Sequence, residues 1–159
     1  LGWIEHDELD LIASLFPTSP AWGVKAFSQQ QCALVEELRP LMAVCSIGCP
    51  YGMIPATRPE PFLLTGALAR LEGSLIYSTA PLLANNVGAP LILTSGAEGM
   101  PQLAGVLTRT LFAPESDSRV APVRLSEAVG MEAVWDLIRG EAALAQRKRV
   151  VEAPPEQTP

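Results

Sequence analysis

The sequence predicts an α/β or α+β domain, built as a single twisted mixed sheet flanked by helices. Three observations lead to this prediction. Short apolar runs alternate along the chain with stretches of helical spacing, which favours a sheet covered by helices over a bundle or a sandwich. Apolar residues make up 48% of the chain and charged residues 18%, a balance typical of a packed core. The length of 159 residues is that of one ordinary domain.

The first third of the chain is expected to hold two helices and one strand. Residues 3–16 carry apolar side chains near helical spacing, and two prolines then stop regular helix. Ser28 can cap a second helix that ends before Pro40. Residues 41–47 form a short apolar run typical of a buried strand, and the proline-rich residues 50–61 are a connection.

The clearest unit follows in the middle of the chain. It is a buried strand over residues 89–94, a small-residue loop over 95–99 and a helix over 100–112 with Pro101 in its first turn. The other expected elements are a helical segment over 62–71, an extended segment over 74–78, a short helical turn over 81–86, a strand over 120–125 and an amphipathic helix over 133–145.

The C-terminal end of the chain differs in composition from the rest. Residues 1–146 are expected to form one domain, and residues 147–159 a flexible, polar, proline-rich tail. The formal net charge is −6, and the one basic cluster, Arg147, Lys148 and Arg149, lies beside the tail. This charge disfavours an extensive nucleic-acid surface, because phosphate contacts come chiefly from clustered Lys and Arg. The role of the basic cluster stays open.

Composition also bears on location and on metals. No run of about 18 apolar residues is free of charge and proline, so no membrane-spanning helix is expected. Residues 1–10 hold four acidic residues and no Lys or Arg, unlike an export signal. Three cysteines, Cys32, Cys45 and Cys49, are too few for a disulfide framework, which favours a cytoplasmic protein. Their spacing with the sole histidine, His6, does not fit a usual zinc site, so we expect no metal and ordinary packing of the cysteines.

The loop over residues 94–99, which reads TSGAEG, is the candidate ligand site. A strand that leads into a helix N-terminus leaves backbone N–H groups unpaired, and these suit an anion. Gly96 and Gly99 would let a ligand approach the backbone closely. Small residues can also simply turn the chain, and Glu98 would repel an anion unless it is turned away. The loop is neither a Walker loop nor a complete dinucleotide-binding fingerprint.

A family resemblance rests on four short segments that occur in the same order along the chain. They are LL…GAPLILTSG…GMP over residues 82–101, FPTSPAWGV over 16–24, RPL over 39–41 and SRV over 118–120. Together they resemble the YrdC-like family of threonylcarbamoyl-AMP synthases. In that family the corresponding segments read LL…G-x-PL…TSAN-x-SG-x-P, hydrophobic-PT-x-T-x-YGL, K-x-RP and S-T-V.

The resemblance implies a twisted α/β sheet whose concave face binds ATP, threonine and bicarbonate and makes threonylcarbamoyl-adenylate for tRNA modification. By position, Thr18 would contact the amino-acid substrate, Arg39 the phosphates, and Thr94 and Ser95 the nucleotide or the carbamoyl group. ATP would act as a substrate, with main-chain donors and hydroxyls holding its phosphates. The candidate ligand-binding residues are therefore Thr18, Arg39, Thr94, Ser95, Gly96 and Gly99.

Two functional hypotheses follow. Glu37 stands where the family has a lysine, and Ala97 where it has an asparagine, so contacts that would hold the phosphates are missing. The first hypothesis is a divergent nucleotide-binding relative, with or without synthase activity. The second is a non-enzymatic adaptor or assembly subunit of a bacterial-type protein complex, whose apolar surplus covers a partner. Enzymatic activity and oligomeric state stay open.

Overall fold

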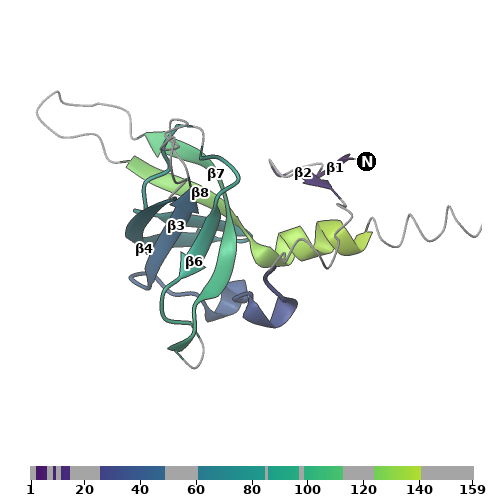
Figure 1. The fold of residues 1–159 in the computed structure, drawn as a ribbon, viewed down its shortest axis with the longest axis horizontal. Coiled ribbons are helices and arrows are strands. Elements are labelled where there is room, and N and C mark those ends of the chain that lie inside the picture. The colour runs from purple at the N-terminus through teal and green to yellow at the C-terminus, as the bar shows by residue number, and fades with distance from the viewer. Residues whose placement is uncertain are drawn as a thin grey trace, which may run out of the picture.

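The structure, a computed structural model, describes residues 3–6, 9, 12–14, 26–48, 61–84, 86–96, 99–112 and 124–140. Six strands close into an antiparallel barrel in the order β3-β4-β5-β8-β7-β6 (Figure 1). The strands are β3 (Ala43–Gly48), β4 (Phe62–Glu72), β5 (Leu75–Ser78), β6 (Pro90–Leu93), β7 (Gln102–Phe112) and β8 (Arg124–Gly130).

The barrel consists of two three-stranded meanders joined at two seams. Strands β3, β4 and β5 form one meander and β6, β7 and β8 the other, each by antiparallel pairing of consecutive strands. One seam pairs β5 with β8, and the other pairs β3 with β6. The chain crosses from one meander to the other through residues 79–89, at the end of the barrel where β3, β5 and β7 finish.

The predicted α/β sheet flanked by helices is wrong, because the described chain is mostly sheet. The helix expected over residues 100–112 is strand β7, which pairs with β6 on one side and β8 on the other. The helical segment expected over 62–71 is strand β4, which pairs with β3 and β5. Both segments contain helix-forming residues, but pairing on both edges overrides that preference.

Three other predicted helical segments also differ. The helix expected over residues 3–16 is replaced by strands β1 (Trp3–Glu5) and β2 (Ile12–Ser14), which pair with each other. The Ser28 helix is replaced by two 3-10 turns, η2 (Gln29–Gln31) and η3 (Val35–Glu37). The chain leaves helical geometry between them because the Ala33 N–H donates to Leu103 O at 2.9 Å. The described residues of 81–86, which are 81–84 and 86, form no helix; the Asn86 N–H closes one turn on Leu83 O at 3.1 Å.

Several predicted elements are confirmed. The apolar runs at 41–47, 74–78 and 89–94 are strands β3, β5 and β6. The strand expected over 120–125 overlaps β8 at Arg124 and Leu125; β8 continues to Gly130, and residues 120–123 are outside the described residues. Residues 131–140 are helical, as the amphipathic pattern over 133–145 predicts. Residues 50–60, 120–123 and 141–159, with the predicted tail, lie outside the described residues.

Three apolar clusters of described residues hold the barrel together, and the smallest is formed by Val129 and Ala133. The first fills its interior with side chains from both meanders, chiefly Val44, Leu68, Ile76, Leu91, Leu107 and Ala128. The second lies on the outside, where Met131, Val134 and Trp135 of the helix pack against strand residues Cys45, Ile92 and Leu103. Cys32 and Cys45 are buried free thiols, so the expected packing of cysteines is confirmed for these two, and Cys49 lies outside the described residues.

Glycine is required where the crossing segment approaches strand β4. A Cβ atom built on Gly66 would lie 2.6 Å from the Cα atom of Ala80, well inside van der Waals contact. Gly66 therefore lets the start of the 79–89 segment lie directly against the strand. The Thr79 N–H donates to Ala67 O at 2.9 Å, and the Ala67 N–H donates to the Thr79 hydroxyl at 2.9 Å, which fixes this approach.

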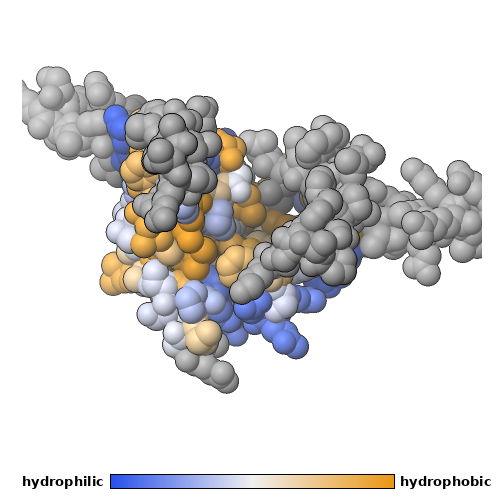
Figure 2. Space-filling view, in the orientation of Figure 1, coloured by the Kyte–Doolittle hydropathy of each residue, from blue (hydrophilic) through white to orange (hydrophobic). Residues whose placement is uncertain are grey.

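Not all apolar side chains are buried. Ile47 of β3 and Leu63 of β4 are cross-strand partners, and with Phe62 they lie exposed at the end of the barrel where β4 begins. Figure 2 shows apolar residues over this face of β3 and β4. None of the helices in the described part of the chain is long and apolar enough to cross a membrane.

Candidate functional site: the mouth of the barrel

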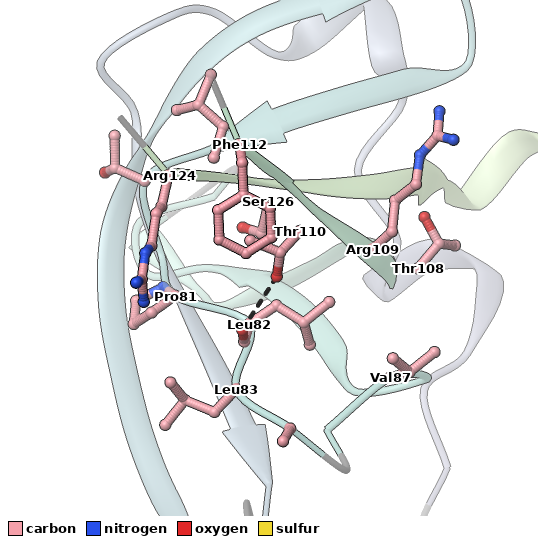
Figure 3. Close-up of a pocket in the computed structure, with 13 residues that line it drawn as sticks. Pro81, Leu82, Leu83, Val87, Thr108, Arg109, Thr110, Phe112, Arg124 and Ser126 are labelled. Carbon is pink, nitrogen blue, oxygen red and sulfur yellow. Dashed lines mark hydrogen bonds between the residues drawn. The ribbon is translucent and has the colours of Figure 1, made fainter. Parts of the chain in front are cut away.

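A hollow of about 600 Å³ opens at the end of the barrel where β7 finishes and β8 begins. The crossing segment 79–87 forms one wall, and strands β7 and β8 form the other (Figure 3). Its volume is within the roughly 300–1,000 Å³ of small-molecule pockets. The lining residues are Thr79, Pro81, Leu82, Leu83, Ala84, Val87, Thr108, Arg109, Thr110, Phe112, Arg124, Leu125 and Ser126. We refer to this hollow as the mouth pocket.

A row of three hydroxyl side chains leads to the mouth pocket, and two of them, Ser126 and Thr110, line it. Ser78, Ser126 and Thr110 are successive cross-strand partners on β5, β8 and β7. The hydroxyls of Ser78 and Ser126 are 2.9 Å apart, and both residues are buried. Ser126 also donates to Ala80 O, and Thr110 donates to Leu82 O at 3.1 Å. These bonds tie the crossing segment to the barrel, so the hydroxyls hold the pocket wall.

The rim of the mouth pocket carries a stacked pair. Phe112 at the end of β7 and Arg124 at the start of β8 are cross-strand partners, and the guanidinium carbon of Arg124 lies 5.5 Å from the centre of the Phe112 ring. A cation over an aromatic face at this distance is attracted by the ring. No ion pair joins Arg124 to another residue in the described part of the chain, so its positive charge is not neutralised there.

The second arginine of the lining has a different role. Arg109 points away from Phe112 and Arg124 in Figure 3. Its Nε and Nη2 atoms donate to the two carboxylate oxygens of Glu127 at 2.8 and 2.9 Å. The Glu127 side chain is only 6% exposed, whereas that of Arg109 is 62% exposed. The charge of Arg109 is thus balanced by a buried carboxylate, and Arg124 is the cation of the rim.

A polar row crosses the outside of the same strands. Arg70, Tyr77, Glu127 and Arg109 are successive cross-strand partners on β4, β5, β8 and β7. Burial raises the pKa of the Tyr77 hydroxyl, and the negative charges of Glu127 and Glu72 raise it further. The Arg70 and Arg109 charges oppose these effects without cancelling them. These four residues lie on the outer side of the strands, and the hydroxyl row of Ser78, Ser126 and Thr110 lies on the inner side of β5, β8 and β7.

The predicted ligand residues lie at the opposite end of the barrel. Thr94 follows β6, where its N–H and its hydroxyl both donate to Ala43 O at 3.1 and 3.2 Å. The Gly96 N–H donates to Met100 O at 2.9 Å, and the Gly99 N–H donates to Gly96 O at 3.1 Å. Ser95 is exposed. Because β7 follows this loop in place of a helix, the helix N-terminus expected to attract an anion is not formed.

Two further predicted residues complete this comparison. Arg39 lies at the same end as Thr94, between η3 and β3, and its guanidinium donates to the carbonyl oxygens of Glu36 and Leu38. It therefore caps the 3-10 turn. Thr18 lies outside the described residues. The structure thus brings Arg39 and the 94–99 loop to one end of the barrel, and their ligand-binding role stays a prediction.

A second hollow, of about 680 Å³, adjoins the predicted loop. Its lining is Ser28, Gln29, Gln30, Cys32, Leu34, Glu37 and Gln102. Gln102 connects it to the loop, because a Cβ atom built on Gly96 would lie 2.7 Å from the Gln102 amide carbon. The charged side chain in this lining is that of Glu37, an acid, so the hollow is a poor match for phosphate.

Sequence reasoning missed the mouth pocket. Its two rim residues, Phe112 and Arg124, belong to different strands and meet only through the pairing of β7 with β8. The nearest signal in the sequence is the pair Thr108 and Thr110, whose spacing places two β-branched residues in a segment read as a helix. Reading residues 102–112 as a strand would have placed Phe112 at its end.

The fold and the pocket together define a small antiparallel barrel with a ligand-sized hollow at its mouth. The sequence matches no protein-family model and no curated protein, and no solved structure matches it either. Function is therefore argued from the site itself.

Proposed function

We propose that this protein is a binding barrel that holds a small organic molecule in the mouth pocket. The observation that carries the proposal is the combination of apolar walls with one rim cation, Arg124, in a hollow of about 600 Å³. Ligand pockets in proteins are typically apolar with a few placed polar groups. The mouth pocket has this composition, whereas the second hollow is lined mainly by amides, a hydroxyl and an acid, with Cys32 and Leu34 beside them and no cation among its described residues.

Binding fits the site better than catalysis. The Thr110 and Ser126 hydroxyls donate to backbone carbonyls of the crossing segment, and the Thr108 hydroxyl donates to Glu127 O at 3.3 Å. A hydroxyl nucleophile needs an adjacent base that accepts its proton, and a backbone carbonyl is not one. The Glu127 carboxylate also lies 3.4 Å from the Thr108 hydroxyl, but it already accepts two hydrogen bonds from Arg109, which oppose its taking up a proton. These hydroxyls shape the pocket, and the rim pair is left to contact the ligand.

The dye 1-anilinonaphthalene-8-sulfonate tests the proposal, because it is an organic anion with an apolar body. We expect saturable fluorescence enhancement with one dye per folded chain. Phe112→Ala should weaken binding by about 1 kcal/mol, roughly fivefold in dissociation constant. Leu63→Ala is the matched control, since Phe112 is 63% and Leu63 61% exposed and only Phe112 lines the pocket. Near-UV circular dichroism on each variant excludes dye binding by a loosened core.

The same pair of variants addresses the adaptor hypothesis. An adaptor would use exposed apolar side chains such as Ile47, Phe62 and Leu63 as its contact surface. If Leu63→Ala removes dye binding and Phe112→Ala does not, that face is the binding surface and the mouth pocket is not. No dye binding by the folded wild-type chain would also contradict the proposed function.

A further inference from the structure

The walls of the mouth pocket limit the kind of molecule that fits them. The inference here rests on the proposed function and concerns the chemical class of its ligand. Six wall residues are aliphatic: Pro81, Leu82, Leu83, Ala84, Val87 and Leu125. Phe112 is the aromatic residue of the lining, and Arg124 already lies over its ring. A flexible aliphatic body therefore finds more contact than a flat ring that needs a stacking partner.

The hydroxyl groups of the pocket offer few hydrogen bonds to a ligand. Thr110 donates to Leu82 O, Ser126 to Ala80 O, and Thr79 to Ala67 O at 3.4 Å. A sugar or another polyhydroxylated ligand would bring several donors and acceptors against these engaged groups and the aliphatic wall. Polar groups that lose water without gaining partners weaken binding. The pocket therefore favours a ligand with a single polar head.

The charges of Arg124 and of the whole chain indicate a polar head that carries a single negative charge. Arg124 is the rim cation, because the charge of Arg109 is balanced by Glu127 through two hydrogen bonds. The contact of Arg124 with the Phe112 ring uses none of its N–H groups in a hydrogen bond, so these groups can receive a planar oxyanion with two hydrogen bonds. The chain as a whole carries −6, which repels multiply charged anions such as a nucleoside triphosphate.

We propose that the mouth pocket binds an aliphatic monocarboxylate, with its chain along the 81–87 wall and its carboxylate on Arg124. The wall provides the apolar contact, and the stacked guanidinium provides one bidentate ion pair. The net charge of the protein acts against this selectivity, because a chain at −6 attracts cations in general. If the protein binds the carboxylate more tightly than the matching amine, the cause is therefore Arg124 at the rim and not the net charge of the protein.

Isothermal titration with three ten-carbon probes tests the proposal. Decanoate, decan-1-ol and decylamine carry an anionic, a neutral and a cationic head on an unbranched chain, and each is used below its solubility limit or micelle concentration. We expect decanoate to bind at least about tenfold more tightly than decan-1-ol, as one charge-assisted ion pair allows. Decylamine should bind most weakly. AMP, with a dianionic phosphate and a ribose, should bind more weakly than decanoate.

Variants of Arg124 test whether this residue causes the preference for decanoate. Arg124→Gln should remove the advantage of decanoate over decan-1-ol, and Arg124→Glu should reverse the order in favour of decylamine. Arg139→Gln is the control, since Arg139 is an exposed arginine on the 131–140 helix, outside the pocket. Its decanoate affinity should equal that of the wild type.

The outcomes separate this inference from the proposed function. If decanoate, decan-1-ol and decylamine bind equally, or if AMP binds more tightly than decanoate, the ligand class is wrong while the pocket remains a binding site. If Arg124→Gln keeps the full decanoate preference, the rim cation is not the head-group contact. If neither the dye nor any of the four probes binds the folded chain, both proposals fail.

Discussion

The carboxylate of Glu127 accepts hydrogen bonds from Arg109 at 2.8 and 2.9 Å on the outer face of the barrel wall. Glu127 is buried, with a 6% exposed side chain, and it also accepts a hydrogen bond from the Thr108 hydroxyl at 3.4 Å. Thr108 occupies the register shift in β7, so the irregularity brings two donors to one carboxylate. The Glu127 carboxylate is therefore buried with hydrogen-bond partners in Arg109 and Thr108.

Removing the arginine should destabilise the fold, because Glu127 would then be a buried carboxylate without its ion-pair partner. We expect Arg109→Met to lower the free energy of unfolding by about 1–3 kcal/mol. Arg70→Met is the control, since Arg70 and Glu72 form a 2.9 Å ion pair in which both side chains are more than half exposed. It should cost no more than about 1 kcal/mol. Urea denaturation measures both, and equal losses would contradict this account of Glu127.

Adding one methyl group at Gly66 should disrupt the approach of the crossing segment to β4. The new Cβ atom would lie 2.6 Å from the Ala80 Cα atom, and backbone atoms cannot move aside as a side chain can. We expect Gly66→Ala to destabilise the protein by about 3 kcal/mol. Gly140→Ala is the control, because a Cβ atom there meets nothing within 4 Å. It lies in helical geometry, so it should be neutral or stabilising by up to about 1 kcal/mol.

The midpoints of thermal unfolding of Gly66→Ala and Gly140→Ala test these two predicted changes in stability. A Gly66→Ala protein as stable as the wild type would mean that the 79–80 backbone is not fixed against the strand. Dye binding to the Gly66→Ala variant should fall as well, since the same segment continues into the pocket wall.

The raised pKa of Tyr77 makes stability depend on alkaline pH. Burial, helped by Glu127 and Glu72, raises this pKa above the ordinary value of 10.0. The folded state therefore holds the proton to higher pH than the unfolded state does. The contribution of Tyr77 is fully present below about pH 10 and is lost as the pH rises from there through the folded pKa.

We expect the unfolding free energy of Tyr77→Phe to fall less steeply with pH above this point than that of the wild type. In a Tyr51→Phe background, absorbance titration of phenolate reports Tyr77 alone, because the chain has two tyrosines. Its midpoint should lie above that of the urea-unfolded chain. A midpoint at or below the unfolded value would rule out the stated cause.

The thiol of Cys45 should be protected from reagents. Burial raises its pKa above 9.0, and the side chain lies in the outer cluster under the 131–140 helix. In a Cys32→Ala, Cys49→Ala protein, an aromatic disulfide reagent should react with Cys45 at least about tenfold more slowly in the folded than in the unfolded state. The absorbance of the released thiolate measures both rates. Equal rates in a sample with native near-UV circular dichroism would show that the cluster does not shield Cys45.

Short elements with clear boundaries could be predicted from the sequence. Strands β3 and β6 are apolar runs that follow or begin at a proline, and the amphipathic spacing of residues 133–140 identifies the helix. Strands β4 and β7 could not be predicted in the same way. Their registers shift between Leu68 and Arg70 and between Leu107 and Arg109, so each loses the alternation that marks a strand.

The burial of β7 adds to this difficulty. Its inner face fills the barrel and part of its outer face lies under the helix, which gives a run of buried residues at Leu103, Ala104 and Gly105. Such a run does not distinguish a strand from a buried helix segment. The same misreading removes one of the reasons to expect an anion at Thr94 to Gly99, namely a helix that begins after residue 99. The mouth pocket depends on pairing across β7 and β8, which no local pattern encodes.

The two seams between the meanders have a consequence for how the chain reaches this structure. The bond between Ser78 and Ser126 joins residues 48 positions apart, and the bond from Thr94 to Ala43 joins residues 51 positions apart. Neither meander can close the barrel alone, so the entropy of forming both long loops is lost before the seams contribute stability. Folding should therefore be slow for a chain of this size, with both seams forming late and together.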